Sequence, residues 1–171
     1  KVTPITAPSI LSEPVGIEVV HITSAIQMKE AVAKACAQAD VLIGAAAPAD
    51  YQPMSTAGQK IKKETVGAGL TLELIKTPDT LAEVKGNFIK VGFAAESEDL
   101  VANAKQKLEN KQCDLFVAND ITATDSGFGV DTNRVTLISR DGKVEALPLM
   151  SKREVADKIL DKVVGMLGKK N

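Results

Sequence analysis

Apolar runs of strand length alternate along the chain with segments whose apolar residues recur at helical spacing. Three of the runs have the length and composition of buried strands, namely residues 41–47, 89–95 and 115–118. Between the last two, Leu100, Ala104 and Leu108 form one stripe, which predicts a helix over 98–111. Strands that alternate with helices are typical of parallel sheets with crossover connections. The pattern therefore predicts a three-layer, Rossmann-like α/β fold with a mostly parallel sheet.

The N-terminal half carries weaker signals. Short strands are predicted over residues 2–6, 17–22 and 70–76. Thr23 or Ser24 can cap a helix that follows it. Thr77-Pro78 predicts the cap and first-turn proline of another short helix. Residues 48–69 form a long polar connection, and a compact domain rarely keeps such a loop without a use for it.

An antiparallel hairpin is predicted in the C-terminal third. It spans about 134–149, with strands at 134–139 and 143–149. Asp141-Gly142 lies between the strands and favours a tight hairpin turn, so the hairpin adds an antiparallel edge to the sheet. Ser151 and Glu154 form a capping box that opens a terminal helix. Because no repeat or low-complexity segment interrupts the pattern, we treat residues 1–171 as a single domain.

Composition narrows the class of protein. The 171 residues carry 21 basic and 22 acidic side chains, which argues against the strongly basic surface of a nucleic-acid binder. No apolar run approaches the roughly 20 residues of a membrane span, and the N-terminus lacks a signal-peptide pattern. The isolated thiols of Cys36 and Cys113 form no disulfide framework, and a single histidine, His21, argues against a zinc site. We therefore expect a cytoplasmic protein with no nucleic-acid or membrane partner.

Polar residues follow each of the three buried strands at its carboxyl end. They are Asp50 and Tyr51 after the first strand, Glu96 and Ser97 after the second, and Asn119 and Asp120 after the third. In an open parallel sheet, ligands bind in the crevice outside the carboxyl ends of the strands. A lysine cluster at 60–63 follows the first of these segments. The arrangement predicts a site for an anionic small molecule.

Each candidate residue also has a purely structural interpretation. The strand end at Gly44–Ala46 is either closely packed or lies against a planar base, with Asp50 accepting hydrogen bonds. The lysines at 60–63 either form a solvated loop face or neutralise charge on a phosphate. Lys107 and Lys111, spaced i and i+4, belong either to an ordinary exposed helix surface or to a clamp on a phosphate chain.

Other chemistries find less support in the sequence. A dinucleotide-binding oxidoreductase needs a strand, turn and helix with Gly-x-Gly-x-x-Gly, which the chain lacks. Gly127-Phe128-Gly129 is not a phosphate loop, because it lacks that context. Neither cysteine has a histidine partner in sequence, so thiol catalysis is not expected. Phe93 is expected in the core, with the wall of a ligand pocket as the alternative.

Five motifs follow one another along the chain: GAAAPADYQP at 44–53, KIKK at 60–63, KTPD at 76–79, VGFAAES at 91–97 and VAND at 117–120. In this order they closely resemble the phosphopantothenoylcysteine synthetases. These are ligases of coenzyme A biosynthesis that are often fused behind a flavin-dependent decarboxylase in bacteria. The resemblance extends along essentially the whole chain.

The resemblance implies a CTP-dependent ligase that joins 4′-phosphopantothenate to L-cysteine. In that reaction the carboxylate of phosphopantothenate attacks the α-phosphate of CTP, which gives an acyl-cytidylate and pyrophosphate. The amine of cysteine then displaces CMP and forms the amide. The resemblance also implies Mg²⁺ bound with CTP and a homodimer, with the 134–149 hairpin as a candidate interface. A flavin-dependent decarboxylase is an implied fusion or association partner, while no flavin is expected on this chain.

The family motifs assign roles to particular residues of this sequence. The implied nucleotide-binding residues are Gly44, Ala45, Ala46, Asp50, Lys60, Pro78, Asp79, Thr80, Leu81, Phe93, Lys107 and Lys111. Gly44–Ala46 and Asp50 match the group that holds the cytidine. Lys60 matches the catalytic residue associated with activation of the carboxylate. Lys107 and Lys111 match the pair that holds the triphosphate, and no residue is assigned to the metal.

The chain departs from the family pattern at its start. Family members begin with a strand, a glycine-rich turn and a Ser-Ser-Gly segment near the phosphopantothenate, whereas this chain starts after them at Lys1. We therefore expect a domain truncated at its N-terminus that binds nucleotide. Ligation by the chain alone stays open, and the alternative is a non-catalytic Rossmann-like nucleotide-binding module or an inactive fragment. Asn119 and Asp120 are given no role.

Overall fold

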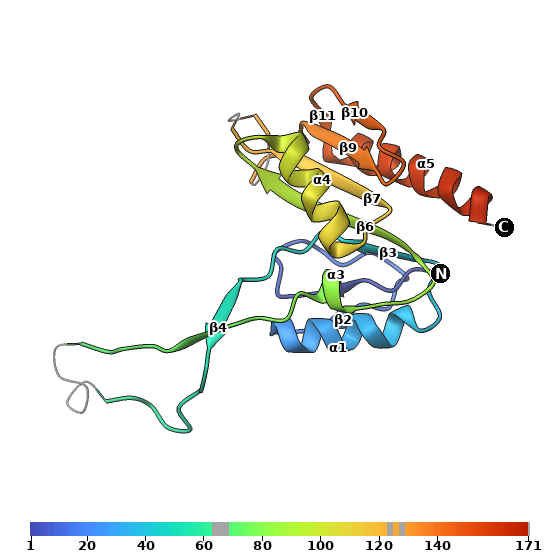
Figure 1. The fold of residues 1–171 in the computed structure, drawn as a ribbon. Helices are drawn as coiled ribbons and strands as arrows, with labels where there is room; N and C mark the ends of the chain where they lie inside the picture. Colours follow the sequence, from blue (N-terminus) through green and yellow to red (C-terminus); the bar gives the residue numbers. More distant parts are fainter. Residues whose placement is uncertain (63–68, 123–124, 127–128, 171) are drawn as a thin grey trace.

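The computed structural model describes residues 1–62, 69–122, 125–126 and 129–170, with the backbone alone for 169 and 170. A five-stranded central sheet has the strand order β10-β9-β7-β6-β3 (Figure 1). The strands are β3 (Val41–Gly44), β6 (Ile89–Glu96), β7 (Leu115–Asp120), β9 (Val135–Ser139) and β10 (Val144–Ala146). β3, β6 and β7 are parallel, whereas β9 and β10 run antiparallel to their neighbours. The predicted α/β fold with an antiparallel hairpin at one edge is confirmed.

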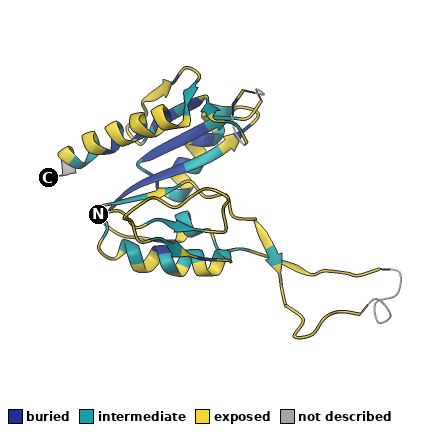
Figure 2. Ribbon diagram, turned by 180° about the vertical axis from the view of Figure 1, so that it is seen from behind, coloured by how far each residue is buried: buried dark blue, intermediate teal, exposed yellow. Residues whose placement is uncertain are grey.

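Helices cover both faces of this sheet, because successive side chains of a strand point to opposite faces. The helices are α4 (Leu100–Lys111) and α5 (Lys152–Lys170). Odd-numbered residues of β7 pack with α5 and even-numbered ones with α4: Leu115 and Val117 cluster with Val155 and Ile159, and Phe116 and Ala118 with Ala104 and Leu108. Figure 2 shows the resulting buried strands between exposed helix surfaces. The predicted helix over 98–111 and its apolar stripe are confirmed.

The N-terminal segment forms less regular structure than predicted. β1 (Ile5–Thr6) and β2 (Val20–His21) are two residues each and pair only with one another, in parallel. Prolines at positions 4 and 8 flank β1 and lack the N–H group that a longer ladder would need. The strands predicted over 2–6 and 17–22 are therefore much shorter and lie outside the central sheet. α1 (Ala25–Cys36) is capped by Ser24, whose hydroxyl accepts a hydrogen bond from the Gln27 N–H at 3.2 Å.

The long polar connection at 48–69 is part of a projecting hairpin. β4 (Tyr51–Pro53) pairs antiparallel with β5 (Leu74–Lys76), and the described residues next to them, 54–62 and 69–73, extend away from the body of the molecule (Figure 1). We call residues 51–76 the arm. Only the last three residues of the strand predicted over 70–76 are paired, and 63–68 lie outside the described residues.

The cap of α3 (Thr80–Glu83) differs from the prediction. Asp79 caps this helix, because its Oδ1 accepts a hydrogen bond from the Ala82 N–H at 3.0 Å. Thr77 was the expected cap, but its hydroxyl donates to the carbonyl of Ala49 instead. The Thr77 N–H also donates to the Asp50 carbonyl at 2.9 Å, so Thr77 closes the base of the arm.

The C-terminal predictions hold in their essentials. Asp141-Gly142 turns the chain between β9 and β10, and Gly142 has a φ of 89° that favours glycine. Beyond β10 the chain forms β11 (Met150–Ser151), which pairs with β8 (Thr132–Asn133) in the connection predicted as a loop. The capping box is confirmed, since the Ser151 N–H donates to Glu154 Oε2 at 2.8 Å and the Glu154 N–H donates to Ser151 Oγ at 3.2 Å. Within the described ranges, no helix has the length and apolar character needed to cross a bilayer.

Candidate functional site

The carboxyl ends of the parallel strands form a stepped edge. Gly44, the last residue of β3, is level with Gly92, while β6 continues for four more residues to Glu96. Glu96 is level with Asp120, the last residue of β7. The predicted meeting of polar strand ends therefore occurs between β6 and β7. The end of β3 lies four residues before the end of β6. We call this edge, together with the adjoining α3 and α4, the crevice.

Leu81 of α3 packs onto the floor of the crevice. A Cβ atom added to Gly44 would lie 2.9 Å from Leu81 Cδ1, and one added to Gly92 would lie 2.8 Å from Leu81 Cδ2. Close packing is thus sufficient to explain the glycine at position 44. Ala45, Ala46 and Asp50 follow it and are exposed, so their backbone and the Asp50 carboxylate are open to a ligand.

Both lysines of the predicted phosphate clamp are held by carboxylates at the crevice. Lys107 Nζ lies 2.6 Å from Glu96 Oε1, and the Glu96 side chain is only 8% exposed. Lys111 Nζ lies 3.1 Å from Asp79 Oδ2, which joins the end of α4 to the start of α3. Lys107 and Lys111 therefore face the strand end and α3. An anion that enters would have to compete with these carboxylates for the ammonium groups.

Two buried polar atoms, one at the start of α3 beside the crevice and one on the α5 side of β7, have no hydrogen-bond partner within the described part of the chain. They are Thr80 Oγ1, at the first residue of α3, and Asn119 Oδ1, near the end of β7. A buried acceptor or hydroxyl without a partner is costly, so each is a candidate for ligand or water contact. Thr80 was among the predicted residues, whereas Asn119 had no assigned role. The signal for Asn119 was its polar side chain at the end of an otherwise apolar strand.

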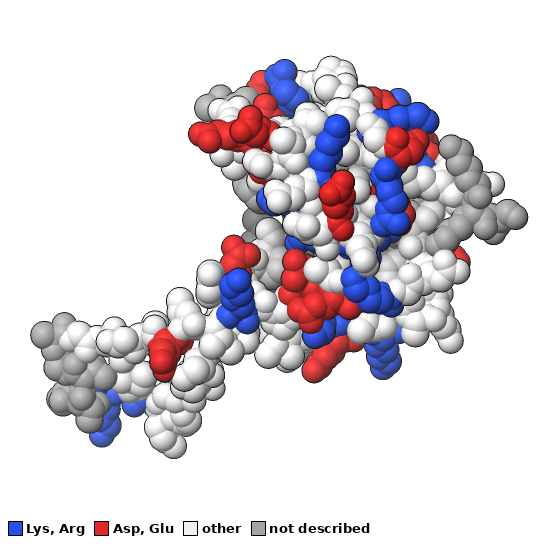
Figure 3. All heavy atoms as spheres, in the orientation of Figure 1, with Lys and Arg blue, Asp and Glu red and all other residues white. Residues whose placement is uncertain are grey.

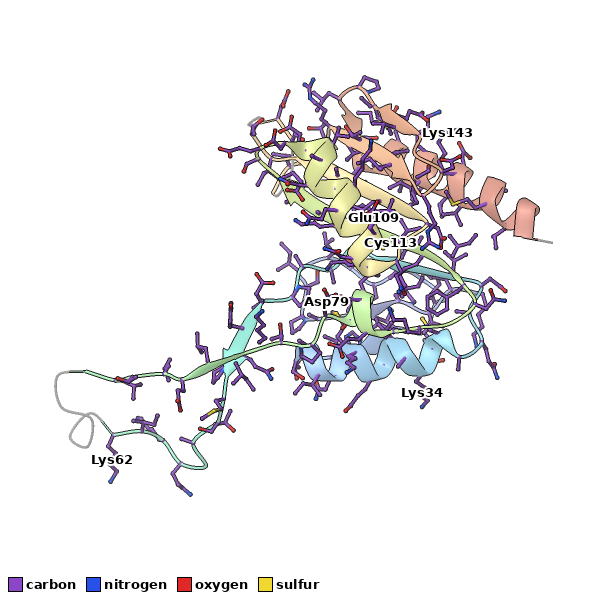
Figure 4. All side chains as sticks on the ribbon, viewed as in Figure 1. Lys34, Lys62, Asp79, Glu109, Cys113 and Lys143 are labelled. Atoms are coloured by element: carbon purple, nitrogen blue, oxygen red, sulfur yellow. The ribbon has the colours of Figure 1, made fainter. Side chains whose placement is uncertain are left out.

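The structure does not bring Lys60 to the crevice of its own chain. Lys60 and Lys62 are exposed on the arm, and Lys63 lies outside the described residues. Figure 4 places Lys62 on the outer part of the arm, well away from Asp79. The expectation that this lysine cluster adjoins the crevice is therefore wrong for Lys60 and Lys62 within a single chain.

Phe93 and Pro78 take different places around the site. Phe93 is partly buried and packs against the cluster that faces α5, which is the face of β6 opposite to Leu81 and Gly92. The core interpretation therefore accounts for Phe93. Pro78 is partly buried directly before the Asp79 cap of α3.

Two carboxylates lie side by side at the ends of β6 and β7. The pKa of Asp120 is lowered, mainly because its carboxylate accepts hydrogen bonds from the hydroxyl and the N–H of Thr122. Mg²⁺ in nucleotide sites is held by one or two carboxylates together with phosphate oxygens, and Glu96 and Asp120 fit that role as register partners. Over the residues with described positions, no group of three or more His, Cys, Asp or Glu side chains could hold a metal by itself.

Acidic and basic side chains are interspersed on the face seen in Figure 3, unlike the single-sign surface of a nucleic-acid binder.

Comparisons with known proteins agree with this fold. A family model described as DNA/pantothenate metabolism flavoprotein C-terminal domain matches residues 1–167. The coenzyme A biosynthesis bifunctional protein CoaBC of Bacillus subtilis (strain 168) is 42% identical over 166 residues, which cover 95% of this chain and 40% of that protein. The chain thus spans well under half of that relative.

Solved structures show the same architecture. The crystal structure of the C-terminal domain of a coenzyme A biosynthesis bifunctional protein CoaBC matches with a TM-score of 0.79 and 33% identity, covering 98% of this chain and 74% of that one. A Cab2 mutant in complex with phosphopantothenate-cysteine matches with a TM-score of 0.65 and 17% identity, covering 90% of this chain and 53% of that one. The second likeness shows the fold alone.

Proposed function

Because the chain belongs to the family of the DNA/pantothenate metabolism flavoprotein C-terminal domain, we propose that it is the nucleotide-binding part of a ligase in coenzyme A biosynthesis. The finer proposal is a CTP-dependent phosphopantothenate–cysteine ligase that works through an acyl-cytidylate. The relative from B. subtilis is named a bifunctional coenzyme A biosynthesis protein, and a Cab2 structure with a similar fold holds phosphopantothenate-cysteine. Both names support a role in coenzyme A biosynthesis, while the dependence on CTP and the acyl-cytidylate rest on the sequence motifs.

The observation that carries the proposal is the pair of lysines held at the crevice by carboxylates. Lys107 and Lys111 bind the triphosphate by exchanging Glu96 and Asp79 for phosphate oxygens. Thr80 Oγ1, at the start of α3, gains a hydrogen-bond partner that it does not have among the described residues.

The remaining residues of the site divide between the nucleoside and the reacting carboxylate. The cytidine is held by Ala45, Ala46 and Asp50. These residues are exposed where β3 ends, so their backbone and the Asp50 carboxylate can reach it. Lys60 neutralises charge as the carboxylate of phosphopantothenate attacks the α-phosphate and pyrophosphate leaves. The cysteine amine then attacks the acyl carbon, and CMP departs. Glu96 and Asp120 would hold Mg²⁺ together with the phosphates of CTP, and the ion would neutralise negative charge on those phosphates.

The nucleotide preference of the chain tests this proposal. We expect CTP to bind at least about tenfold more tightly than ATP or UTP, because the base rather than the shared triphosphate carries the selectivity. Isothermal titration calorimetry with the three nucleotides and Mg²⁺ measures this directly. Equal affinities for all three nucleotides would contradict the assignment to CTP.

We also propose that the chain acts as a homodimer in which the arm meets a second copy. Leu70, Leu72 and Leu74 alternate along the arm and are 55%, 62% and 55% exposed. A two-stranded hairpin is only marginally stable alone in water, so these leucines favour a partner surface. In such a dimer Lys60 would reach the crevice of the other copy, which accounts for its distance from its own. The hairpin of β9 and β10, with the exposed edge strand β10, is a second candidate surface.

Breaking the apolar stripe of the arm tests the dimer. We expect Leu72→Glu to weaken self-association at least about tenfold, because it places a charge within the proposed interface. The matched control is Thr71→Glu, which adds the same charge to the arm at a neighbouring position outside the row of leucines. Sedimentation velocity over a concentration series measures both variants. A Leu72→Glu variant that associates like the wild type excludes the arm as the interface.

The relationship to a decarboxylase is a further part of the proposal. The chain spans 40% of a relative named as bifunctional, which supports fusion to, or association with, a flavin-dependent decarboxylase. We propose no flavin contact on this chain.

A further inference from the structure

A lysine lies inside the protein at the second residue of β6. The Lys90 residue is 5% exposed, and the residues on either side of it, Ile89 and Val91, are apolar and buried. Lysine is almost never buried to this degree unless its ammonium group is paired. The contacts of Lys90 therefore call for a specific explanation.

The partners of this ammonium group are backbone carbonyls. Lys90 Nζ donates to the carbonyls of Leu81 at 2.7 Å, Val84 at 2.9 Å and Lys111 at 3.2 Å. An ammonium group has three protons, so these three bonds use its full capacity. Burial lowers the pKa of Lys90, and the ring of Phe88 lies 5.9 Å from Nζ.

The three carbonyls belong to the ends of two helices. Leu81 and the C-cap residue Val84 belong to α3, and Lys111 is the last residue of α4. Carbonyls in the last turn of a helix lack partners within the helix, and the negative end of the helix dipole favours a cation. One side chain thus satisfies the ends of α3 and α4 together. For α3 this matters most, because a helix of four residues has little stability of its own.

Both helices carry the residues proposed for the nucleotide. α3 begins with the Asp79 cap and Thr80, and α4 bears Lys107 and Lys111. We propose that Lys90 is a positioning residue that fixes α3 against α4 and so places the Thr80 hydroxyl and the Lys111 ammonium for the triphosphate. The functional consequence rests on the proposed nucleotide site. The mechanical part, one ammonium locking two helix ends together, stands independently of it.

Replacement of Lys90 in the 171-residue chain tests the proposal. Lys90→Met keeps the length of the side chain and removes the charge, and we expect it to raise the Kd for CTP about tenfold. Val91→Ala is the control, because it thins the same buried strand without touching either helix end and is expected to leave the Kd within about twofold. Lys90→Gln keeps neutral N–H donors and serves if Lys90→Met does not fold.

A second readout needs no nucleotide. Amide hydrogen exchange of the free protein is expected to accelerate in α3 and at the end of α4 in Lys90→Met or Lys90→Gln, and not to do so selectively in Val91→Ala. Unchanged exchange in both segments of a folded Lys90 variant would overturn the positioning role. Faster exchange with an unchanged Kd would overturn its link to the nucleotide. If the wild type binds no nucleotide, the proposed function fails, while the exchange data still decide the role of Lys90.

Discussion

Lys60→Ala in the full-length protein is expected to slow acyl-cytidylate formation by about 10²–10³-fold. The reason is that an ammonium group placed at the reacting carboxylate and phosphate stabilises charge that develops only in the transition state. Because Lys60 is proposed to act on charge that is absent from the ground state, CTP affinity is expected to change little. Rapid-quench analysis of pyrophosphate release in a single turnover measures the step.

Two further variants make this result specific. Gln59→Ala truncates the neighbouring side chain on the arm and is expected to react at the wild-type rate. Lys60→Arg keeps the charge and is expected to recover part of the activity. A Lys60→Ala protein that forms the intermediate at the normal rate would show that Lys60 has no role in activating the carboxylate.

Subunit mixing decides whether Lys60 acts on its own copy or on the partner. In a heterodimer of Lys60→Ala and Lys111→Ala chains, action in trans creates one complete site, since each chain supplies what the other lacks. Random mixing in equal amounts then restores about a quarter of the wild-type activity in a C2 dimer. Action in cis restores none.

Gly92→Ala is expected to lower the free energy of unfolding by about 3 kcal/mol, the upper part of the range for overpacking a core. The new Cβ would lie 2.6 Å from Phe116 Cε2 and 2.8 Å from Leu81 Cδ2. The Leu81 side chain can rotate, but Phe116 is fully buried between β6 and α4 and has nowhere to move. Urea denaturation measures the loss.

The matched control is Gly58→Ala on the arm, where an added Cβ would meet nothing within 4 Å. It is expected to leave the unfolding midpoint unchanged. We further expect Gly92→Ala to weaken CTP binding in the folded fraction, because displacement of Leu81 moves α3. A midpoint equal to that of the wild type would mean that the core around Phe116 can shift without cost.

Local patterns predicted the C-terminal two thirds of the fold well. The stripe of Leu100, Ala104 and Leu108 identified α4, and the Asp141-Gly142 turn identified the hairpin. The capping box of Ser151 and Glu154 marked the start of α5. These features depend on residues close in sequence, so hydrophobic period and turn chemistry are sufficient to specify them.

Predictions that depended on distant partners were less accurate. Thr77 is a residue type that favours a helix cap, yet its hydroxyl donates a hydrogen bond to the carbonyl of Ala49, 28 positions earlier in the chain. The alternating pattern of 70–76 does end in a strand, β5, but this strand pairs with β4 at the base of the arm and not with the central sheet. In each case the hydrogen-bond partner lies far away in the sequence, so the pattern of neighbouring residues could not predict it.

The sequence by itself determined that polar residues follow the parallel strands, because the ends of apolar runs are visible in the order of residues. It also carried the motifs that place the chain in its family. Only the tertiary structure decided which of those residues meet. Ion pairs between α4, α3 and β6 joined Lys107 to Glu96 and Lys111 to Asp79, while the arm carried Lys60 away. The tertiary structure also decided the contacts of Lys90, a lysine in an otherwise apolar strand. A buried ammonium group needs hydrogen-bond acceptors, and in this fold the nearest ones are carbonyls at the ends of α3 and α4.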